Sequence, residues 1–204
     1  NQNPSFPVMT TKNMAAILKA VLKDIEPKER VINKEVSSVL TKINSALKKK
    51  KIKAKVVAGG SIAKGTFLKD DHDADVFALF HKSYHDQDIS KLLGQTLRSV
   101  FPKVKKLHGS RDYFQLTPKQ SQFVYEIVPV IHIKKAEQAF NTTDCSPLHV
   151  RWVVAKLKKK RHLRKEIRLL KAFCKAIGVY GAESYIRGFS GHVVDILTIH
   201  HGGF

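Results

Sequence analysis

The chain has 204 residues, of which 43% are hydrophobic, so it can form one large or two small folded domains and is not intrinsically disordered. Its formal net charge of +20 favours a polyanionic partner, and we expect nucleic acid or a nucleotide ahead of an anionic membrane surface. No apolar run reaches membrane-spanning length, and only two cysteines, Cys145 and Cys174, occur, which indicates a reducing, cytoplasmic setting without a disulfide framework.

Two helices are predicted ahead of the first strand. The first is expected over residues 14–25, where apolar side chains recur at helical spacing. The second begins near Pro27, which suits a first helical turn, and continues to about Lys48. The basic run 48–51 then ends the helix, either as a solvated end or as a phosphate contact.

The most informative stretch combines a strand, a turn and a second strand. Residues 52–58 are apolar and predict the first strand, and the turn 59–61 lets backbone N–H groups approach an anion, with a short helix starting near Ser61. Asp73 and Asp75 open the second strand, where residues two apart share a face. Two carboxylates on one face repel each other, and Mg²⁺, which prefers carboxylate and phosphate oxygens, would relieve that repulsion.

Simpler interpretations apply to the neighbouring residues. Asp70 and Asp71 are interpreted as solvated loop acids, the usual place for an acidic pair. The spacing of Gly60 and Gly65 is that of a phosphate-binding P-loop, but Thr66 stands where that signature requires lysine, so we reject a P-loop.

A further helix and two strands follow. The helix is expected over residues 89–101, and the strands over 113–116 and 122–131, joined by a turn. Glu126 is an acid on an otherwise apolar face of the second of these strands. From the residues alone, a structural role at a strand end and a role in a site are equally open for Glu126.

The last third of the chain is predicted to be helical. One helix begins at Pro147 with Ser146 as its N-cap, a second carries an apolar stripe and ends at Gly178, and a third covers residues 190–199. Between the first two, residues 156–165 are densely basic.

Two residues of these helices are candidates for a site. His149, in the first turn of its helix, is either a structural or a surface histidine by its position alone. Lys171 borders a buried helix face, so it either extends along the surface or points into a cleft, where it would hold a phosphate.

Residues 60–77 resemble the signature of the DNA polymerase β-like nucleotidyltransferases, and in particular of the archaeal, class I, CCA-adding tRNA nucleotidyltransferases. The shared pattern is G-S-x-A-K-G-T-x-L-x-x-x-x-D-x-D-x-F. Segments 126–129, 147–149, 169–171, 178–183 and 188–191 also resemble this family, in its order. The resemblance therefore spans about residue 14 to the end of the chain.

The resemblance implies an α+β fold, with a small mixed or antiparallel sheet flanked by helices and then a mainly helical segment of a central domain. We expect residues 1–140 to form the catalytic head domain with its N-terminal helices, and residues 141–204 to begin the central, or neck, domain. The implied reaction is metal-dependent addition of CMP and AMP, from CTP and ATP, to the 3′ hydroxyl of tRNA.

The resemblance also implies roles for individual residues. Asp73, Asp75 and Glu126 would be the catalytic acids and would hold two Mg²⁺ ions, with Mn²⁺ as a substitute; Glu126 stands where the family usually has aspartate. The nucleotide and its phosphates would be bound by Gly60, Ser61, Lys64, His149, Lys171 and Tyr180.

Three questions stay open at this point. Family members continue into body and tail domains that grip tRNA, so the sequence is expected to be a fragment or a reduced protein, with a separate chain as a further partner. A reduced protein would be an RNA-binding or weakly active remnant. Another template-independent nucleotidyltransferase, such as a poly(A) polymerase or an oligoadenylate synthetase-like enzyme, would share the same acids.

Overall fold

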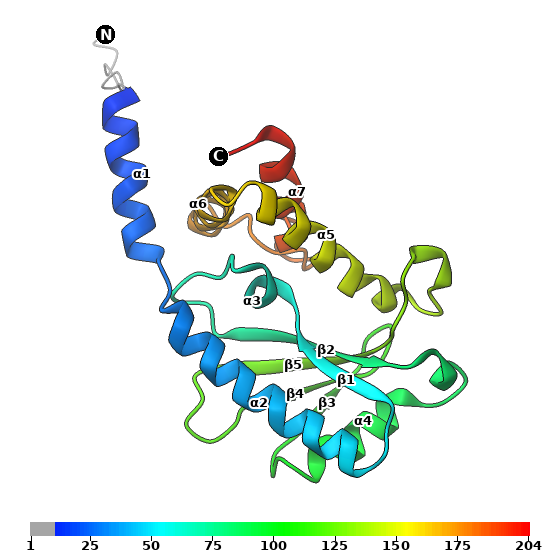
Figure 1. Cartoon of the computed structure of the whole chain (residues 1–204). Helices are drawn as coiled ribbons and strands as arrows, with labels where there is room; N and C mark the ends of the chain where they lie inside the picture. Colours follow the sequence, from blue (N-terminus) through cyan, green and yellow to red (C-terminus); the bar gives the residue numbers. More distant parts are fainter. Residues whose placement is uncertain (1–10) are drawn as a thin grey trace.

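The computed structural model describes residues 11–204, so the first ten residues of the expected head domain lie outside it (Figure 1). The helices are α1 (Thr11–Ile25), α2 (Glu29–Lys49), α3 (Gly60–Lys64), α4 (Ile89–Arg98), α5 (Ser146–Lys159), α6 (Leu163–Ala176) and α7 (Gly191–His201). The strands are β1 (Ala54–Ala58), β2 (Asp73–Phe80), β3 (Lys105–Leu107), β4 (Tyr113–Leu116) and β5 (Val124–Ile131).

The strands form one mixed sheet in the order β1-β2-β5-β4-β3. The central pair, β2 and β5, is parallel, and the other neighbours are antiparallel. Helices flank the sheet, with α2 and α4 on one side and α5, α6 and α7 grouped near α3 (Figure 1). The expected α+β fold with a small mixed sheet is therefore confirmed.

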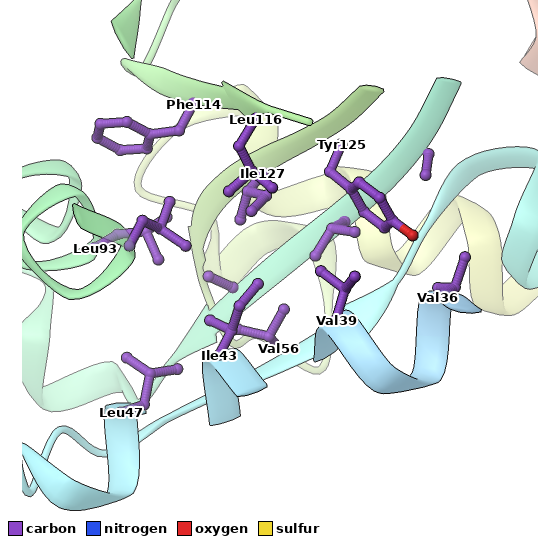
Figure 2. Close-up of a cluster of buried hydrophobic side chains, with 14 of the residues drawn as sticks. Val36, Val39, Ile43, Leu47, Val56, Leu93, Phe114, Leu116, Tyr125 and Ile127 are labelled. Atoms are coloured by element: carbon purple, nitrogen blue, oxygen red, sulfur yellow. The ribbon is translucent and has the colours of Figure 1, made fainter. Parts of the chain in front are cut away.

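The main core lies between the sheet and helices α2 and α4. Alternate residues of β2, such as Ala74 and Val76, are fully buried and point toward these helices, because successive side chains of a strand face opposite sides. Figure 2 shows Val36 and Val39 of α2 near the Tyr125 ring of β5, and Ile43 of α2 beside Val56 of β1. The opposite face of β2 carries Asp73, Asp75 and Phe77, so burial of one face directs the acids to the other.

A second, smaller core holds the C-terminal helices together. It is formed by buried side chains from α5, α6 and α7: Val153, Leu157, Leu163, Ile167, Cys174 and Val194. Of the predicted apolar stripe of α6, Leu163, Ile167, Leu170 and Cys174 pack inside this helical group, with Cys174 buried as expected, whereas Ile177 at its end is exposed. The expected division into two domains near residue 140 remains a prediction.

Polar contacts join the helical group to the end of α3 and the start of α2. The guanidinium of Arg168 on α6 donates to the Gly65 carbonyl at 3.0 Å and pairs with Glu29 at the start of α2. Arg164 donates to the Lys64 carbonyl at 3.3 Å. Helix α1 also contacts α6, so it lies nearer the helical group than the main core.

Three local details differ from the sequence-based expectation. Strand β3 was not predicted, because its sequence Lys105-Lys106-Leu107 is short and has no apolar alternation. Helix α4 ends at Arg98, three residues earlier than expected. Ser146 is the first residue of α5 instead of its N-cap; the cap position is Cys145, which makes no side-chain capping bond. Among the described residues, no helix is both long and apolar enough to cross a membrane.

Candidate active site

One cavity of about 660 Å³ lies between the acid-bearing face of the sheet and the helical group. All nine residues predicted from the sequence to form the site line it: Gly60, Ser61, Lys64, Asp73, Asp75, Glu126, His149, Lys171 and Tyr180. They come from α3, β2, β5, α5, α6 and the segment after α6. The fold therefore brings together side chains that are more than a hundred residues apart in the sequence.

The acids lie on the two central strands. Asp75 and Glu126 are partners in the parallel β2–β5 register, and Asp73 precedes Asp75 on the same face. Burial raises the pKa of Asp75, and the nearby Glu126 carboxylate raises it further, while the ammonium groups of Lys64 and Lys171 oppose both effects. The protein thus concentrates like charges at one point, which costs free energy unless positive charge is supplied.

The glycine turn fits closely around Asp75. The Gly59 N–H donates to the Asp75 carbonyl at 2.8 Å, which joins the turn to β2. Gly60 has a positive φ of +45°, and a Cβ atom there would lie 1.7 Å from Asp75 Oδ2. Because only glycine lacks that atom and adopts this conformation readily, the turn requires glycine at this position.

A glutamine on the neighbouring strand holds Glu126. Gln115 of β4 is the antiparallel register partner of Glu126, and its Nε2 donates to Glu126 Oε1 at 2.6 Å. This bond fixes the Glu126 carboxylate, whose side chain is longer than that of aspartate, at the cavity wall. The sequence contained a signal for Gln115, since alternation on β4 places it on the same sheet face as Glu126.

Each of the three lysines that line the cavity is already paired with a carboxylate. Lys64 Nζ lies 2.5 Å from Asp195 Oδ2, in a pair whose two side chains are 9% and 2% exposed. Lys171 and Lys175, one turn apart on α6, both contact Asp71, at 2.5 and 2.6 Å. Lys171 thus points into the cavity instead of extending along the surface.

The expectation for Asp71 is wrong. Its side chain is 10% exposed and lies against α6, whereas the adjacent Asp70 is exposed as predicted. Burial alone would raise the pKa of Asp71, but its contacts, above all those with Lys171, hold that pKa below its ordinary value. Asp71 is therefore a charged residue of the cavity, and a local reading of the sequence could not detect it, because its partners lie a hundred residues later.

Aromatic rings complete the helical wall. The Tyr180 ring lies 5.4 Å from Lys171 Nζ and 5.5 Å from Lys175 Nζ, within the range of cation–π attraction. His149 stacks on His192 of α7, with ring centroids 4.6 Å apart and an angle of 9° between the planes. Burial lowers the pKa of His192, and the neighbouring His149 lowers it further. His192, Lys175 and Asp195 were not identified from the sequence.

The acids provide the donor atoms that a hard cation needs. Asp73, Asp75 and Glu126 offer carboxylate oxygens, which suit Mg²⁺ and Mn²⁺. The pKa of Asp75 is raised first by burial and then by the neighbouring Glu126 and Asp73 carboxylates. Within residues 11–204, no three His, Cys, Asp or Glu side chains are gathered closely enough to hold a metal ion by themselves. The residues fit such an ion in donor type, and substrate phosphates would have to supply further ligands.

Two family models match the chain. A model described as "Nucleotidyltransferase domain" matches residues 40–172, and one described as "tRNA nucleotidyltransferase, second domain" matches residues 165–204. Among curated proteins, the CCA-adding enzyme of Nanoarchaeum equitans is 43% identical over 149 residues, which are 73% of this chain and 36% of that protein. The CCA-adding enzyme of Methanocaldococcus jannaschii is 30% identical, over 96% of this chain and 44% of its own length.

The chain thus spans less than half the length of these curated relatives. Solved structures share the fold at low identity. The poly(U) polymerase Cid1, in a structure with Mg and 3′-dATP, superposes with a TM-score of 0.72 at 19% identity, over 93% of this chain and 55% of that one. E. coli CdnC with ATP superposes with a TM-score of 0.64 at 19% identity, over 90% and 64%.

Proposed function

Since the chain belongs to the family of proteins with a nucleotidyltransferase domain, we propose that it is the catalytic part of a metal-dependent enzyme that adds CMP and AMP, from CTP and ATP, to the 3′ end of tRNA. The main support is the cavity that combines three carboxylates on β2 and β5 with lysines on α3 and α6. The curated relatives are named CCA-adding enzymes, which favours this reaction and the tRNA acceptor over other nucleotidyl transfers.

Asp73, Asp75 and Glu126 would hold two Mg²⁺ ions, with Mn²⁺ as a substitute. When bound, such ions activate the attacking hydroxyl and neutralise charge on the triphosphate. Gln115 keeps the Glu126 carboxylate at the wall of the cavity, through its bond of 2.6 Å. Lys64 and Lys171 oppose the rise in the pKa of Asp75, so they favour the ionised form that such a site needs.

The triphosphate would lie between the turn and the helical wall. Gly60 and Ser61 line the sheet side of the cavity, and Lys171, Lys175 and Tyr180 line the opposite side. An ammonium group attracts phosphate oxygens as a point charge. His149, with His192 stacked on it, would contact the sugar or a phosphate. Residues Gly60, Ser61, Lys64, His149, Lys171 and Tyr180 keep the nucleotide-binding roles proposed for them.

The direct test is transfer from labelled CTP and ATP to a tRNA that lacks its CCA end, in the presence of Mg²⁺. We expect the wild-type protein to complete CCA and stop. Asp75→Asn should abolish transfer, and Asp70→Asn, which neutralises an exposed acid close by in the sequence, should leave it unchanged. Equal activity of the two variants would contradict the assignment of Asp75.

Another template-independent nucleotidyltransferase is the second candidate, because the fold is shared with a poly(U) polymerase. Such an enzyme would extend RNA beyond CCA or use an acceptor other than tRNA, so product length on tRNA and on an unrelated RNA separates the two. A folded wild-type protein that binds RNA but transfers no nucleotide, alone or with a chain that supplies body and tail domains, would instead be an RNA-binding remnant.

A further inference from the structure

The cavity contains an anion of the protein's own at the place where phosphates are proposed to bind. Asp71 Oδ2 contacts Lys171 Nζ at 2.5 Å, and Asp71 Oδ1 contacts Lys175 Nζ at 2.6 Å. Both oxygens of one carboxylate are therefore used, one on each lysine. A third contact, from the Leu68 N–H to Asp71 Oδ2 at 2.9 Å, ties the carboxylate to its own loop.

The charges of this cluster do not balance. One carboxylate faces two ammonium groups. The Tyr180 ring that both ammonium groups contact carries no formal charge, because burial and nearby carboxylates raise the pKa of its hydroxyl. Burial lowers the pKa of Lys171, and Asp71 opposes that shift, so Asp71 favours the charged form of the buried lysine. Taken by itself, the cluster has one positive charge left over, so a further anion is favoured at these lysines, on the side of the cavity away from the carboxylates of Asp73, Asp75 and Glu126.

The two groups of lysine–carboxylate ion pairs in the cavity differ in how easily a ligand can replace the carboxylate. The Lys64–Asp195 pair is closed on both sides, with side chains 9% and 2% exposed. In the Asp71 cluster, Lys175 is 41% exposed, so its contact with Asp71 can be exchanged while Lys171 and the Leu68 N–H still hold the Asp71 carboxylate. An incoming polyphosphate would therefore exchange with Asp71 before it exchanges with Asp195.

We propose that Asp71 is an internal counter-anion of the polyphosphate site, which holds Lys171 and Lys175 until the phosphates of a ligand replace its carboxylate. A ligand that takes both lysines must offer oxygens to each, as the linked phosphates of a nucleoside triphosphate or of pyrophosphate do. The proposal rests on the proposed function for the identity of the nucleotide, but the exchange itself needs only a polyphosphate.

This exchange would make Asp71 a residue that sets affinity. Every anion that occupies both lysines must first displace the Asp71 carboxylate. Its binding is therefore weakened by the free energy of that displacement, whichever anion it is. As pyrophosphate leaves, Asp71 would return to the lysines, so no unpaired buried ammonium group is left behind. Asp71 thus positions the lysines in the free protein and competes with the ligand for them.

The test is calorimetric titration with inorganic tripolyphosphate, in EDTA and without nucleotide or RNA, so that it is independent of transfer activity. Asp71→Asn removes the charge but keeps an oxygen that can accept from the Leu68 N–H; Asp71→Ser is a second variant that also keeps an acceptor. We expect both to bind tripolyphosphate about three- to tenfold more tightly than wild type, since a competing ion pair is lost. Asp70→Asn is the matched control and should bind like wild type.

A double-mutant cycle shows whether the effect of Asp71→Asn on tripolyphosphate binding depends on the lysines. In a Lys175→Met background, the gain from Asp71→Asn should shrink, because the more exposed contact that exchanges is already absent. An equal gain in tripolyphosphate affinity in both backgrounds would mean that Asp71 acts only through the net charge of the protein. That result would overturn the proposed exchange. Binding of the Asp71 variants that is unchanged or weaker, relative to Asp70→Asn, would also overturn it, and would make Asp71 a fixed support of Lys171.

Discussion

Gly60→Ala tests whether the glycine turn positions the acid of β2. A Cβ atom at residue 60 would lie 1.7 Å from Asp75 Oδ2, and an ordinary contact begins at 3.4 Å, so the carboxylate oxygen must retreat by about 1.7 Å. A displacement of about 1 Å can cost a hundredfold in rate when it moves a reacting group. We therefore expect transfer to fall by about a hundredfold or more.

A matched control separates the cost of alanine at a positive φ from the cost of its clash with Asp75. Gly178, after α6, also has a positive φ, +73°, but a Cβ atom there would meet nothing within 4 Å. Alanine in this conformation costs about 1–2 kcal/mol at either site. At the size of this chain, that lowers the melting temperature by about 2–4 °C per kcal/mol. Gly178→Ala should show this loss with transfer unchanged, whereas Gly60→Ala should lose both stability and transfer.

The assay is CCA addition by each variant, at a temperature at which both are folded, together with thermal melting. If Gly60→Ala loses no more transfer than Gly178→Ala, the close approach between the turn and Asp75 is irrelevant to the reaction. That result would also remove the main physical reason for a glycine at residue 60.

Three further predictions concern charge and positioning. Because burial and Glu126 raise the pKa of Asp75 in the folded protein, wild type loses stability relative to Asp75→Asn as pH rises from the ordinary aspartate pKa to that raised pKa. Asp75→Asn should therefore melt higher than wild type at neutral pH in EDTA, and a pH series should show the difference vanishing below the ordinary aspartate pKa. Gln115→Leu should reduce transfer about tenfold or more with little change in melting, since Glu126 loses its donor; equal transfer would assign Gln115 to the fold alone. The affinity for RNA should fall as the salt concentration rises, with a log–log slope of about −0.7 per phosphate neutralised on a single strand, because the basic segments 48–51 and 156–165 would contact phosphates. Phosphate contacts do not specify a sequence, so we expect little preference for tRNA over a hairpin. Salt-insensitive, tRNA-selective binding in a filter assay would contradict this prediction.

The acids on the sheet could be predicted because they depend on a local rule. Alternation along β2 puts Asp73 and Asp75 on one face, and the same rule puts Glu126 on the matching face of β5. The apolar residues between them identify the opposite face as buried. Strand pairing was not needed for this inference, although the parallel register is what places Asp75 directly beside Glu126.

The charged partners could not be predicted, because they depend on how distant elements pack. Asp71 has the sequence context of a solvated loop acid, and it is buried only because α6 covers it. Asp195 is 131 residues from Lys64, and nothing in either segment indicates the other. Lys175 is the exception, since it follows Lys171 by one helical turn and could have been assigned to the same face.

The acids and the lysines of the cavity are carried by structural elements that are held in place in different ways. Strands β2 and β5 are inner strands of the sheet, with β1 and β4 as their outer neighbours, so a shift of either would break hydrogen-bond ladders on both of its sides. Helices α6 and α7, which carry Lys171, Lys175 and His192, contact the residues around α3 and the loop before β2 through ion pairs and a backbone carbonyl. Substitutions can therefore reshape the helical wall, and with it the choice of ligand, while the sheet wall and its carboxylates stay in place. Evolution could thus change what this cavity accepts without rebuilding the part that performs the chemistry.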